Sequence, residues 1–482
     1  MIQRLLKVNF VYAIGSVANG AALFLLIPFL VKYLSTADFG LWSISEVMIY
    51  FLSLVIMAGM DIYLMREYWF LKSESERSLL AGTMLGMVTV WGAGMLTLFT
   101  IMVLLLSKNG ILFNQFDPLV LVLIAAIGYS EVIFTLLLSL FRIQEKPLPF
   151  VVLSVGRTAL FMGAAIFWMK TGIGLSGALA GRLTAAIVFI VFAWAMARKY
   201  VQVGLSSKHL RPWSNYGLPM VLSGLAFYVL IAADRYALQV MAGLEAVAVY
   251  SFSYKLAASV DILVTRPFAM DWAARRFRIA TQEQPQREYV NAAVLYTFIA
   301  LWCALFVQAA SPLLYDWFAP FIYIQGLQIL PILLAANIVM GLSYPLNVGI
   351  MLKDRTKLLM PITAFAGVVY LLALLLLISY NPIKGAAWAT LLAYFVYTTG
   401  IAWVSLRLYP VKYPIGNWVA LGAGAFLAFV GLFLLDLFNT YTSSLWVMVL
   451  VRGLLVSLFF LLTGYFLWKH RAGLVALENV SS

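Results

Sequence analysis

Apolar residues occur in long, nearly unbroken runs along this chain, and short polar segments separate the runs. The runs are about 20 residues or longer, which at 1.5 Å per residue matches the roughly 30 Å hydrocarbon core of a bilayer. Transmembrane β-strands would instead alternate over about ten residues. The pattern predicts an all-α polytopic membrane protein with fourteen membrane helices. They are expected at 8–31, 41–65, 79–106, 119–141, 148–168, 175–196, 215–241, 246–268, 289–313, 324–351, 358–379, 385–407, 417–437 and 445–468.

The basic residues test this topology, because Lys and Arg accumulate in the cytoplasmic loops of membrane proteins. Alternate loops of the predicted arrangement hold 23 basic residues on one side and four on the other. The four are Lys32, Lys108, Lys170 and Lys384. The split predicts that both termini lie in the cytoplasm.

Composition agrees with a membrane protein, since 64% of the residues are hydrophobic and 11% are charged. A net charge of +13 could indicate a nucleic-acid partner, but the basic residues are spread through short loops, so none is expected. Cys303 is the only cysteine, and His209 and His470 are the only histidines. We therefore expect no metal site, no disulfide and no cofactor.

Two nucleotide-binding motifs bear on the source of energy. No Gly-Lys dipeptide occurs, so the chain lacks the phosphate-binding loop of P-loop ATPases. Residues 172–177 fit G-x-G-x-x-G, but they follow no predicted strand, and their glycines are better explained by a turn and by close helix packing together with Gly181. Any energy for transport must come from a gradient or a partner.

An internal repeat is suggested by a shift of 208 residues. The shift places Gly40–Ser45 on Ala248–Ser253 and the pair Gly177-Ala178 on Gly385-Ala386. It predicts two six-helix lobes, 1–211 and 212–412, followed by two further helices and a cytoplasmic tail in 413–482. Two lobes of equal orientation around a central cavity would suit alternating access. Chance matches among apolar residues are the alternative.

Charged residues inside the predicted helices are the most informative feature for function. A charge at the centre of a membrane helix costs about 2.5–3.5 kcal/mol on insertion scales, so such residues usually face a cavity or a partner. The predicted substrate-binding residues are Arg157, Arg182, Arg235 and Lys255. The residues predicted to serve coupling or charge pairing are Glu131, Asp234 and Asp261. Structural ion pairs, such as Glu131 with Arg157, are the alternative.

Three side chains of the eighth predicted helix share one face. Tyr250 and Tyr254 are four residues apart, and Asp261 follows seven residues later. This face is a candidate cavity wall, with plain packing as the alternative. Arg182 has Ala178, Ala185 and Ala186 on its side of the sixth helix, which predicts a tight interior position.

Several segments resemble the polysaccharide-biosynthesis flippases of the multidrug/oligosaccharidyl-lipid/polysaccharide exporter superfamily. They are YLSTADFGLWSI (33–44), SLFRIQEK (139–146), YGLPMVLSGLAFYVLIAADRYAL (216–238), GLEAVAVYSFSYKLA (243–257), NVGIMLKDRTKLL (347–359) and NPIKGAAWATLLAY (381–394). The resemblance spans essentially the whole chain. It implies two six-helix lobes around an often basic cavity.

The same resemblance implies a function and its partners. The expected activity is movement of a polyprenyl-diphosphate-linked oligosaccharide, such as an O-antigen or related repeat unit of lipopolysaccharide, across the bacterial inner membrane by alternating access. The expected protein is a transporter and not an enzyme, in contact with membrane lipids and with the polysaccharide polymerase and chain-length machinery. The alternatives are a drug or cation antiporter of the same superfamily and a membrane glycan polymerase.

Overall fold

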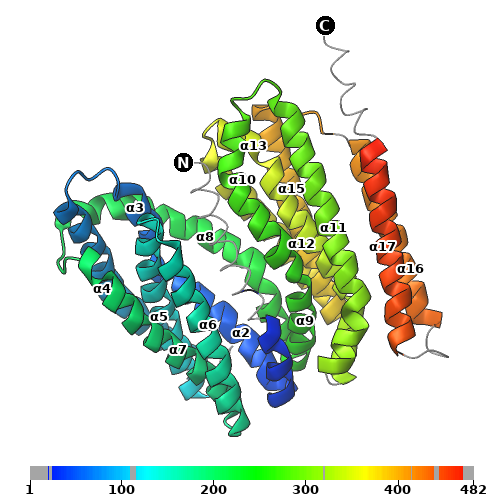
Figure 1. Cartoon of the computed structure of the whole chain (residues 1–482). Helices are drawn as coiled ribbons and strands as arrows, with labels where there is room; N and C mark the ends of the chain where they lie inside the picture. Colours follow the sequence, from blue (N-terminus) through cyan, green and yellow to red (C-terminus); the bar gives the residue numbers. More distant parts are fainter. Residues whose placement is uncertain are drawn as a thin grey trace. The chain divides into compact units, whose positions relative to one another are not determined.

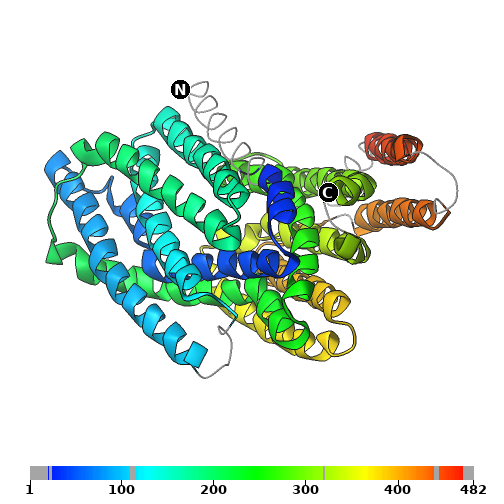
Figure 2. The same cartoon turned by 90° about the horizontal axis from the view of Figure 1, so that it is seen from below.

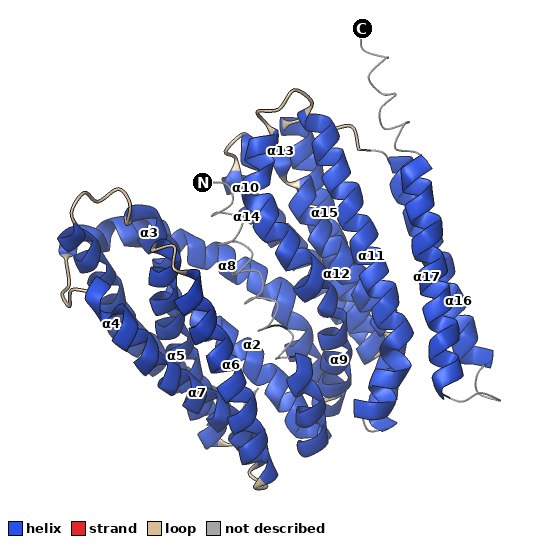
Figure 3. Cartoon of the chain, viewed as in Figure 1, coloured by secondary structure: helices blue, strands red, loops and turns tan. Residues whose placement is uncertain are grey.

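A computed structural model describes residues 20, 24–108, 115–318, 321–413, 415–438 and 445–469. These residues form helices joined by short loops, and no strand occurs among them (Figure 3). The chain divides into two compact units, Met1–Ala248 and Val249–Ser482. The lobe boundaries at 211/212 and 412/413 and the six-helix repeat remain predictions.

The helices of the first unit run from α2 to α8, and α9 crosses into the second unit. They are α2 (Thr36–Met57), α3 (Met60–Glu67), α4 (Glu74–Lys108), α5 (Pro118–Ile143), α6 (Pro147–Lys170), α7 (Gly174–Ala197), α8 (Ser207–Ala242) and α9 (Leu244–Ala257). Those of the second unit are α10 (Arg266–Ile279), α11 (Pro285–Phe318), α12 (Leu330–Leu346), α13 (Val348–Leu352), α14 (Leu359–Ile378), α15 (Pro382–Leu408), α16 (Ile415–Phe438) and α17 (Leu445–Lys469).

Eleven helical segments among the described residues are long and apolar enough to cross a membrane. Three shorter apolar helices, Phe24–Tyr33, Leu421–Leu432 and Val451–Gly464, lie where the sequence predicts the first and the last two membrane helices. Most of the first expected helix, residues 8–19 and 21–23, lies outside the described residues. The prediction of an all-α polytopic membrane protein is confirmed.

Local sequence signals set several helix starts. Asp117 caps α5 by accepting a hydrogen bond from the Leu119 backbone N–H at 2.7 Å, and Pro118 occupies the first turn. Asn381 likewise caps α15 by accepting a hydrogen bond from the Lys384 backbone N–H, and Pro382 is the first residue of that helix. A capping side chain satisfies one unpaired N–H of the first turn, and proline loses nothing there because its missing N–H would be unpaired anyway.

In the first unit, α5 is the central element and packs against α2, α3, α4, α6 and α7. Helices α5, α6 and α7 run side by side in the cyan and teal part of Figure 1, and α6 and α7 make the most extensive pairing. Figure 2 shows the same helices from below. Three neighbouring membrane helices thus bring their mid-membrane residues within reach of one another.

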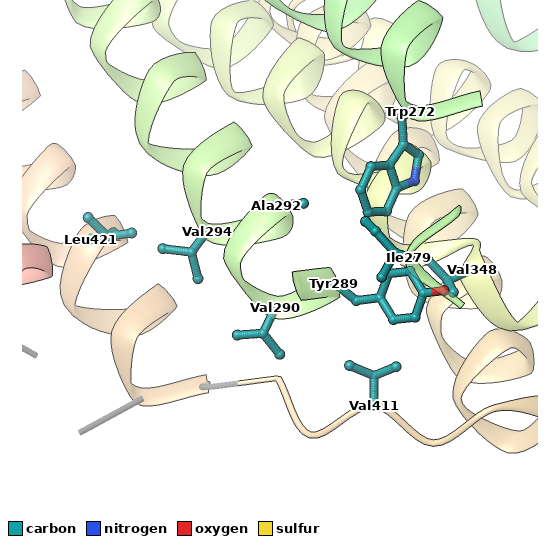
Figure 4. Packing of buried hydrophobic residues seen from close by; sticks show 9 residues of the cluster. All are labelled: Trp272, Ile279, Tyr289, Val290, Ala292, Val294, Val348, Val411 and Leu421. Atoms are coloured by element: carbon teal, nitrogen blue, oxygen red, sulfur yellow. The ribbon is translucent and has the colours of Figure 1, made fainter. Parts of the chain in front are cut away.

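The second unit is built around α11, α12 and α15, with α14 packed on α15 and the hairpin of α16 and α17 packed on α11. One of its apolar clusters joins α10, α11, α13 and α16 to the loop after α15 (Figure 4). The nine residues labelled there are Trp272, Ile279, Tyr289, Val290, Ala292, Val294, Val348, Val411 and Leu421. Tyr289 anchors this cluster by donating its hydroxyl to the Arg276 carbonyl oxygen at 2.8 Å.

A π-helical turn interrupts the membrane span that contains α9 and α10. The turn covers Asp261–Thr265, and the Arg266 backbone N–H closes it on the Asp261 carbonyl oxygen. The Thr265 hydroxyl oxygen lies 2.9 Å from the Tyr296 hydroxyl oxygen of α11. The turn holds one more residue than an α-helical turn, so α10 does not continue the faces of α9.

Candidate functional site

The structure brings three of the predicted site residues together on α5, α6 and α7. Glu131 lies at the middle of α5 and Arg157 at the middle of α6, while Arg182 lies in the first half of α7. We call Glu131, Arg157 and Arg182 the arginine–glutamate triad. It combines two guanidinium groups with one carboxylate in the interior of the first unit.

Glu131 uses both of its carboxylate oxygens in the triad. Its Oε2 accepts from Arg157 Nη1 at 2.5 Å, and its Oε1 accepts from Arg182 Nη2 at 3.1 Å and Nε at 3.2 Å. The side chains of Arg157, Arg182 and Glu131 keep 24%, 21% and 15% of their surface exposed. The triad is therefore net positive and not sealed within the protein.

Aromatic rings support both guanidinium groups. Arg157 lies over the Phe134 ring at 4.5 Å from its centroid, and Arg182 lies 6.0 Å from the centroid of Phe161. An aromatic face attracts a cation and shields one side of the guanidinium plane without using its N–H donors. The in-plane donors consequently stay available for oxygen atoms.

A glycine permits the close approach of α6 and α7 beside the triad. A Cβ atom on Gly181 would lie 2.5 Å from the Ala165 backbone nitrogen and 2.7 Å from its Cα. Ala178 and Ala185, on the same side of α7 as Arg182, are fully buried. The packing role of Gly181 is confirmed, because only small residues let two helix backbones approach so closely. Arg182, which follows Gly181, is partly buried.

Arg235 and Asp234 form a separate pair on α8. Arg235 Nη1 lies 3.2 Å from Asp234 Oδ1 and donates to the Ile231 carbonyl oxygen at 2.6 Å. Asp234 is 1% exposed and Arg235 is 8% exposed. Arg235 is thus paired with its sequence neighbour and buried more deeply than the triad.

The remaining predicted site residues belong to the second unit. Lys255 is half-buried on α9. Asp261 accepts from Arg266 Nε at 2.7 Å, in a pair whose side chains are 33% and 60% exposed. Tyr250 is fully buried, and its hydroxyl oxygen lies 3.0 Å from that of Thr390. For Tyr250 the alternative of plain packing therefore holds.

Sequence reasoning missed several neighbours of these charges. Phe161 follows Arg157 by four residues and Phe134 follows Glu131 by three, so helical spacing carried a signal for both rings. The charge count assigns Arg266 to the cytoplasmic loops, yet it is the partner of Asp261. Tyr228 and Tyr236 are eight residues apart on α8, and their hydroxyl oxygens lie 3.0 Å from each other.

The sequence predicts no metal chemistry. Within the ranges that the structure describes, no group of three or more His, Cys, Asp or Glu residues is placed to hold a metal ion. The charged groups of the triad and of the pair on α8 are arginines and single carboxylates, which suit ion pairing and anion binding.

Comparison with solved structures shows which proteins share this fold. Solved structures of similar fold include a lipid II flippase, MurJ, in an inward closed conformation, with a TM-score of 0.68 and 14% identity, over 98% of this chain and 100% of that chain. They also include an inward-facing multidrug resistance MATE family transporter of the MOP superfamily, with a TM-score of 0.61 and 16% identity, over 84% and 95% of the two chains. MATE in the straight conformation gives a TM-score of 0.60 and 16% identity over 85% and 96%.

No curated protein sequence matches the chain significantly. The sequence pattern of a family described as "Polysaccharide biosynthesis protein" matches residues 5–270, which is more than half of the chain and includes the whole triad. The fold, the multi-pass membrane architecture and this match agree with one another. The chain belongs to the polysaccharide biosynthesis protein family.

Proposed function

We propose that this protein is a flippase that moves a polyprenyl-diphosphate-linked oligosaccharide, an O-antigen or related surface-polysaccharide repeat unit, from the cytoplasmic to the periplasmic leaflet. The observation that carries the proposal is the net-positive triad of Glu131, Arg157 and Arg182 in mid-membrane segments of α5, α6 and α7. The proposal is supported by the membership of the chain in a polysaccharide biosynthesis family and by the similarity of its fold to that of a lipid II flippase.

The chemistry of the cargo explains the need for two arginines. A diphosphate is an anion that would be costly to move through hydrocarbon without counter-charge. Guanidinium groups offer planar pairs of N–H donors that match phosphate oxygens, and Arg157 and Arg182 reach one point from two different helices. In the proposed mechanism the triad neutralises the diphosphate while the two lobes alternate between inward and outward access.

The other predicted residues have secondary roles in this proposal. Arg235 and Lys255 are proposed to line the cargo path, Lys255 by its charge and Arg235 after its pair with Asp234 opens. Asp234 and Asp261 are proposed to hold basic neighbours and to couple charge to the conformational cycle. A buried carboxylate either pairs or changes protonation when its surroundings change, which is the basis for their role.

The setting follows from the proposed cargo. The protein would lie in a bacterial inner membrane with both termini in the cytoplasm, in contact with membrane lipids. It would receive finished lipid-linked repeat units from the cytoplasmic leaflet and deliver them to the polysaccharide polymerase and chain-length machinery. It would act as a transporter without a cofactor and not as an enzyme.

The test measures delivery of lipid-linked glycan in a deletion strain complemented with variants, with surface polysaccharide as readout and membrane levels checked by blotting. We expect the Arg157→Ala, Arg182→Ala double variant to lose delivery, and the corresponding Lys variants to retain part of it because charge remains while paired N–H donors are lost. Arg66→Ala, in an exposed ion pair on α3, is the matched control and should deliver normally. Normal delivery by a well-expressed double alanine variant would refute the assignment of the triad.

A second candidate is a drug or cation antiporter, which the similarity of fold to MATE transporters supports. A cationic substrate would call for an excess of acidic groups, whereas the triad carries an excess of positive charge. Drug-sensitivity assays separate the two: a flippase leaves drug resistance unchanged when it is deleted, while deletion of an antiporter lowers it.

A further inference from the structure

The contacts of Glu131 suggest how the triad takes and releases its anion. We propose that Glu131 is an internal counter-ion, which occupies the donors of Arg157 and Arg182 and is displaced from them when an anionic phosphate binds. The inference rests on the proposed function of the triad and extends it by giving the carboxylate a defined role.

Glu131 occupies the positions that a phosphate would need. Arg182 presents its Nε and Nη2 side by side to one carboxylate oxygen, at 3.2 and 3.1 Å, while Arg157 Nη1 holds the other oxygen at 2.5 Å. The carboxylate thus bridges two guanidinium groups with its two oxygen atoms. A phosphate group can bridge two guanidinium groups with two of its oxygen atoms in the same way. The carboxylate therefore resembles the ligand that it would exclude.

The charge balance makes the displacement selective. With Glu131 ionised the triad carries one net positive charge, and with Glu131 neutral it carries two. A diphosphate esterified at both ends carries one negative charge on each phosphate, about two in total, and this total is matched only by the second state. A carboxylate that stays ionised beside the bound phosphate would repel it, and this repulsion is large in an environment of low dielectric constant.

Few charged groups influence proton binding at Glu131 in the part of the chain that the structure describes. Helices α2, α3, α4, α6 and α7 all pack against α5. Among the residues that the structure describes, the charged groups that act on Glu131 are Arg157 of α6 and Arg182 of α7. Asp61 of α3 is instead acted on by Arg142, near the end of α5. Burial favours a proton on Glu131, and the two arginines that would bind the anion oppose it.

Reciprocal linkage gives the consequence. If a proton on Glu131 frees the arginines for the anion, then the bound anion must favour a proton on Glu131 by the same factor. Anion binding should strengthen as the pH falls, and each anion bound should be accompanied by proton uptake. The two arginines would in this way exchange the Glu131 carboxylate for the phosphate, and Glu131 would take up a proton as the phosphate binds.

The experiment titrates purified full-length protein in detergent with inorganic diphosphate by isothermal calorimetry. Glu131→Gln, which mimics the protonated side chain, should bind diphosphate about tenfold more tightly than the wild type or better. Glu74→Gln makes the same chemical change at the exposed start of α4 and should bind as the wild type does. The Arg157→Ala, Arg182→Ala double variant should lose binding.

Proton uptake is measured on the same proteins in two buffers of different ionisation enthalpy. The wild type should take up more protons per diphosphate than Glu131→Gln, in which only the titration of the ligand remains. If the glutamine variant does not fold, the wild type alone gives the test. Proton uptake by the wild type that is no greater than the uptake expected from titration of the diphosphate itself would refute the inference.

The outcomes separate the inference from the proposed function. Loss of binding in the double alanine variant, with unchanged or weaker binding in Glu131→Gln, would show that Glu131 positions the arginines and does not compete with the anion. That result overturns the inference and leaves the anion site in place. Normal diphosphate binding by the double alanine variant overturns both.

Discussion

The contact between α6 and α7 at Gly181 can be tested by adding a single methyl group. A Cβ there would meet three backbone atoms of α6 at 2.5, 2.7 and 2.8 Å, whereas ordinary contacts begin at 3.4 Å. Backbone atoms cannot rotate away, so Gly181→Ala must separate the two helices locally by about 1 Å. The separation would also move Arg182 relative to Arg157 and Glu131.

A matched control isolates the cost of this contact. Gly163 lies within α6, and a Cβ added to it would have no atom within 4 Å, so Gly163→Ala adds the same methyl group in open space. Both variants gain about 0.5–1 kcal/mol of helix propensity, which cancels in the comparison. The difference between them is the overpacking cost of Gly181→Ala, which we expect to be about 1–3 kcal/mol.

The assay is thermal unfolding of both purified variants in the same detergent, followed by glycan delivery in cells. A destabilisation of 1 kcal/mol lowers the melting temperature by about 2–4 °C in a domain of about 200 residues. Gly181→Ala should therefore melt several degrees below Gly163→Ala and deliver less glycan. A Gly181→Ala protein that melts at or above the Gly163→Ala protein would refute the close helix contact.

Three further predictions concern the other charged groups and the topology. Asp234→Asn should destabilise the protein by about 3–5 kcal/mol, because it removes a carboxylate from a deeply buried pair. Asp261→Asn, in an exposed pair, should cost about 1 kcal/mol or less. Equal melting temperatures of the two variants would contradict this ranking. Burial, together with nearby Lys208, lowers the pKa of His209 below its usual 6.5. The unfolded state therefore binds more protons than the folded state, and stability should fall as the pH drops below about 6.5. His209→Gln should flatten this pH dependence of the melting temperature, and an unchanged slope would exclude His209 as its source. Cysteines introduced at residues 280–284, between α10 and α11, should react with reagents only from the cytoplasmic side, and a cysteine at Lys384 only from outside; the reverse pattern would reject the topology.

The fold class could be predicted because membrane helices are encoded locally, in runs of apolar residues long enough to span a bilayer. The pairing of Glu131 with Arg157 was also foreseeable, as one of two interpretations of the buried charges. Arg182 could not be assigned to the same carboxylate from the sequence, because its position depends on the approach of α7 to α6 at Gly181. That approach is a property of tertiary packing, which periodicity within one helix does not contain.

The pair formed by Asp261 and Arg266 shows a second limit of sequence reasoning. Arg266 lies near the end of the expected helix 246–268 and a proline follows it, so the charge count groups it with the cytoplasmic loops. In the structure it begins α10, which continues the same membrane span. Charge counting could not show that the helix passes through this arginine, because it considers each basic residue without its neighbours in space.

The π-helical turn at Asp261–Thr265 acts as a rotational offset inside one membrane span. One extra residue turns everything that follows by about 100° around the helix axis. A helix face traced from α9 into α10 at a period of 3.6 residues would consequently be out of phase by this angle after the turn. Removing one residue from the turn would not shorten the span noticeably, but it would rotate α10 relative to α9 and turn the buried Trp272 away from its neighbours.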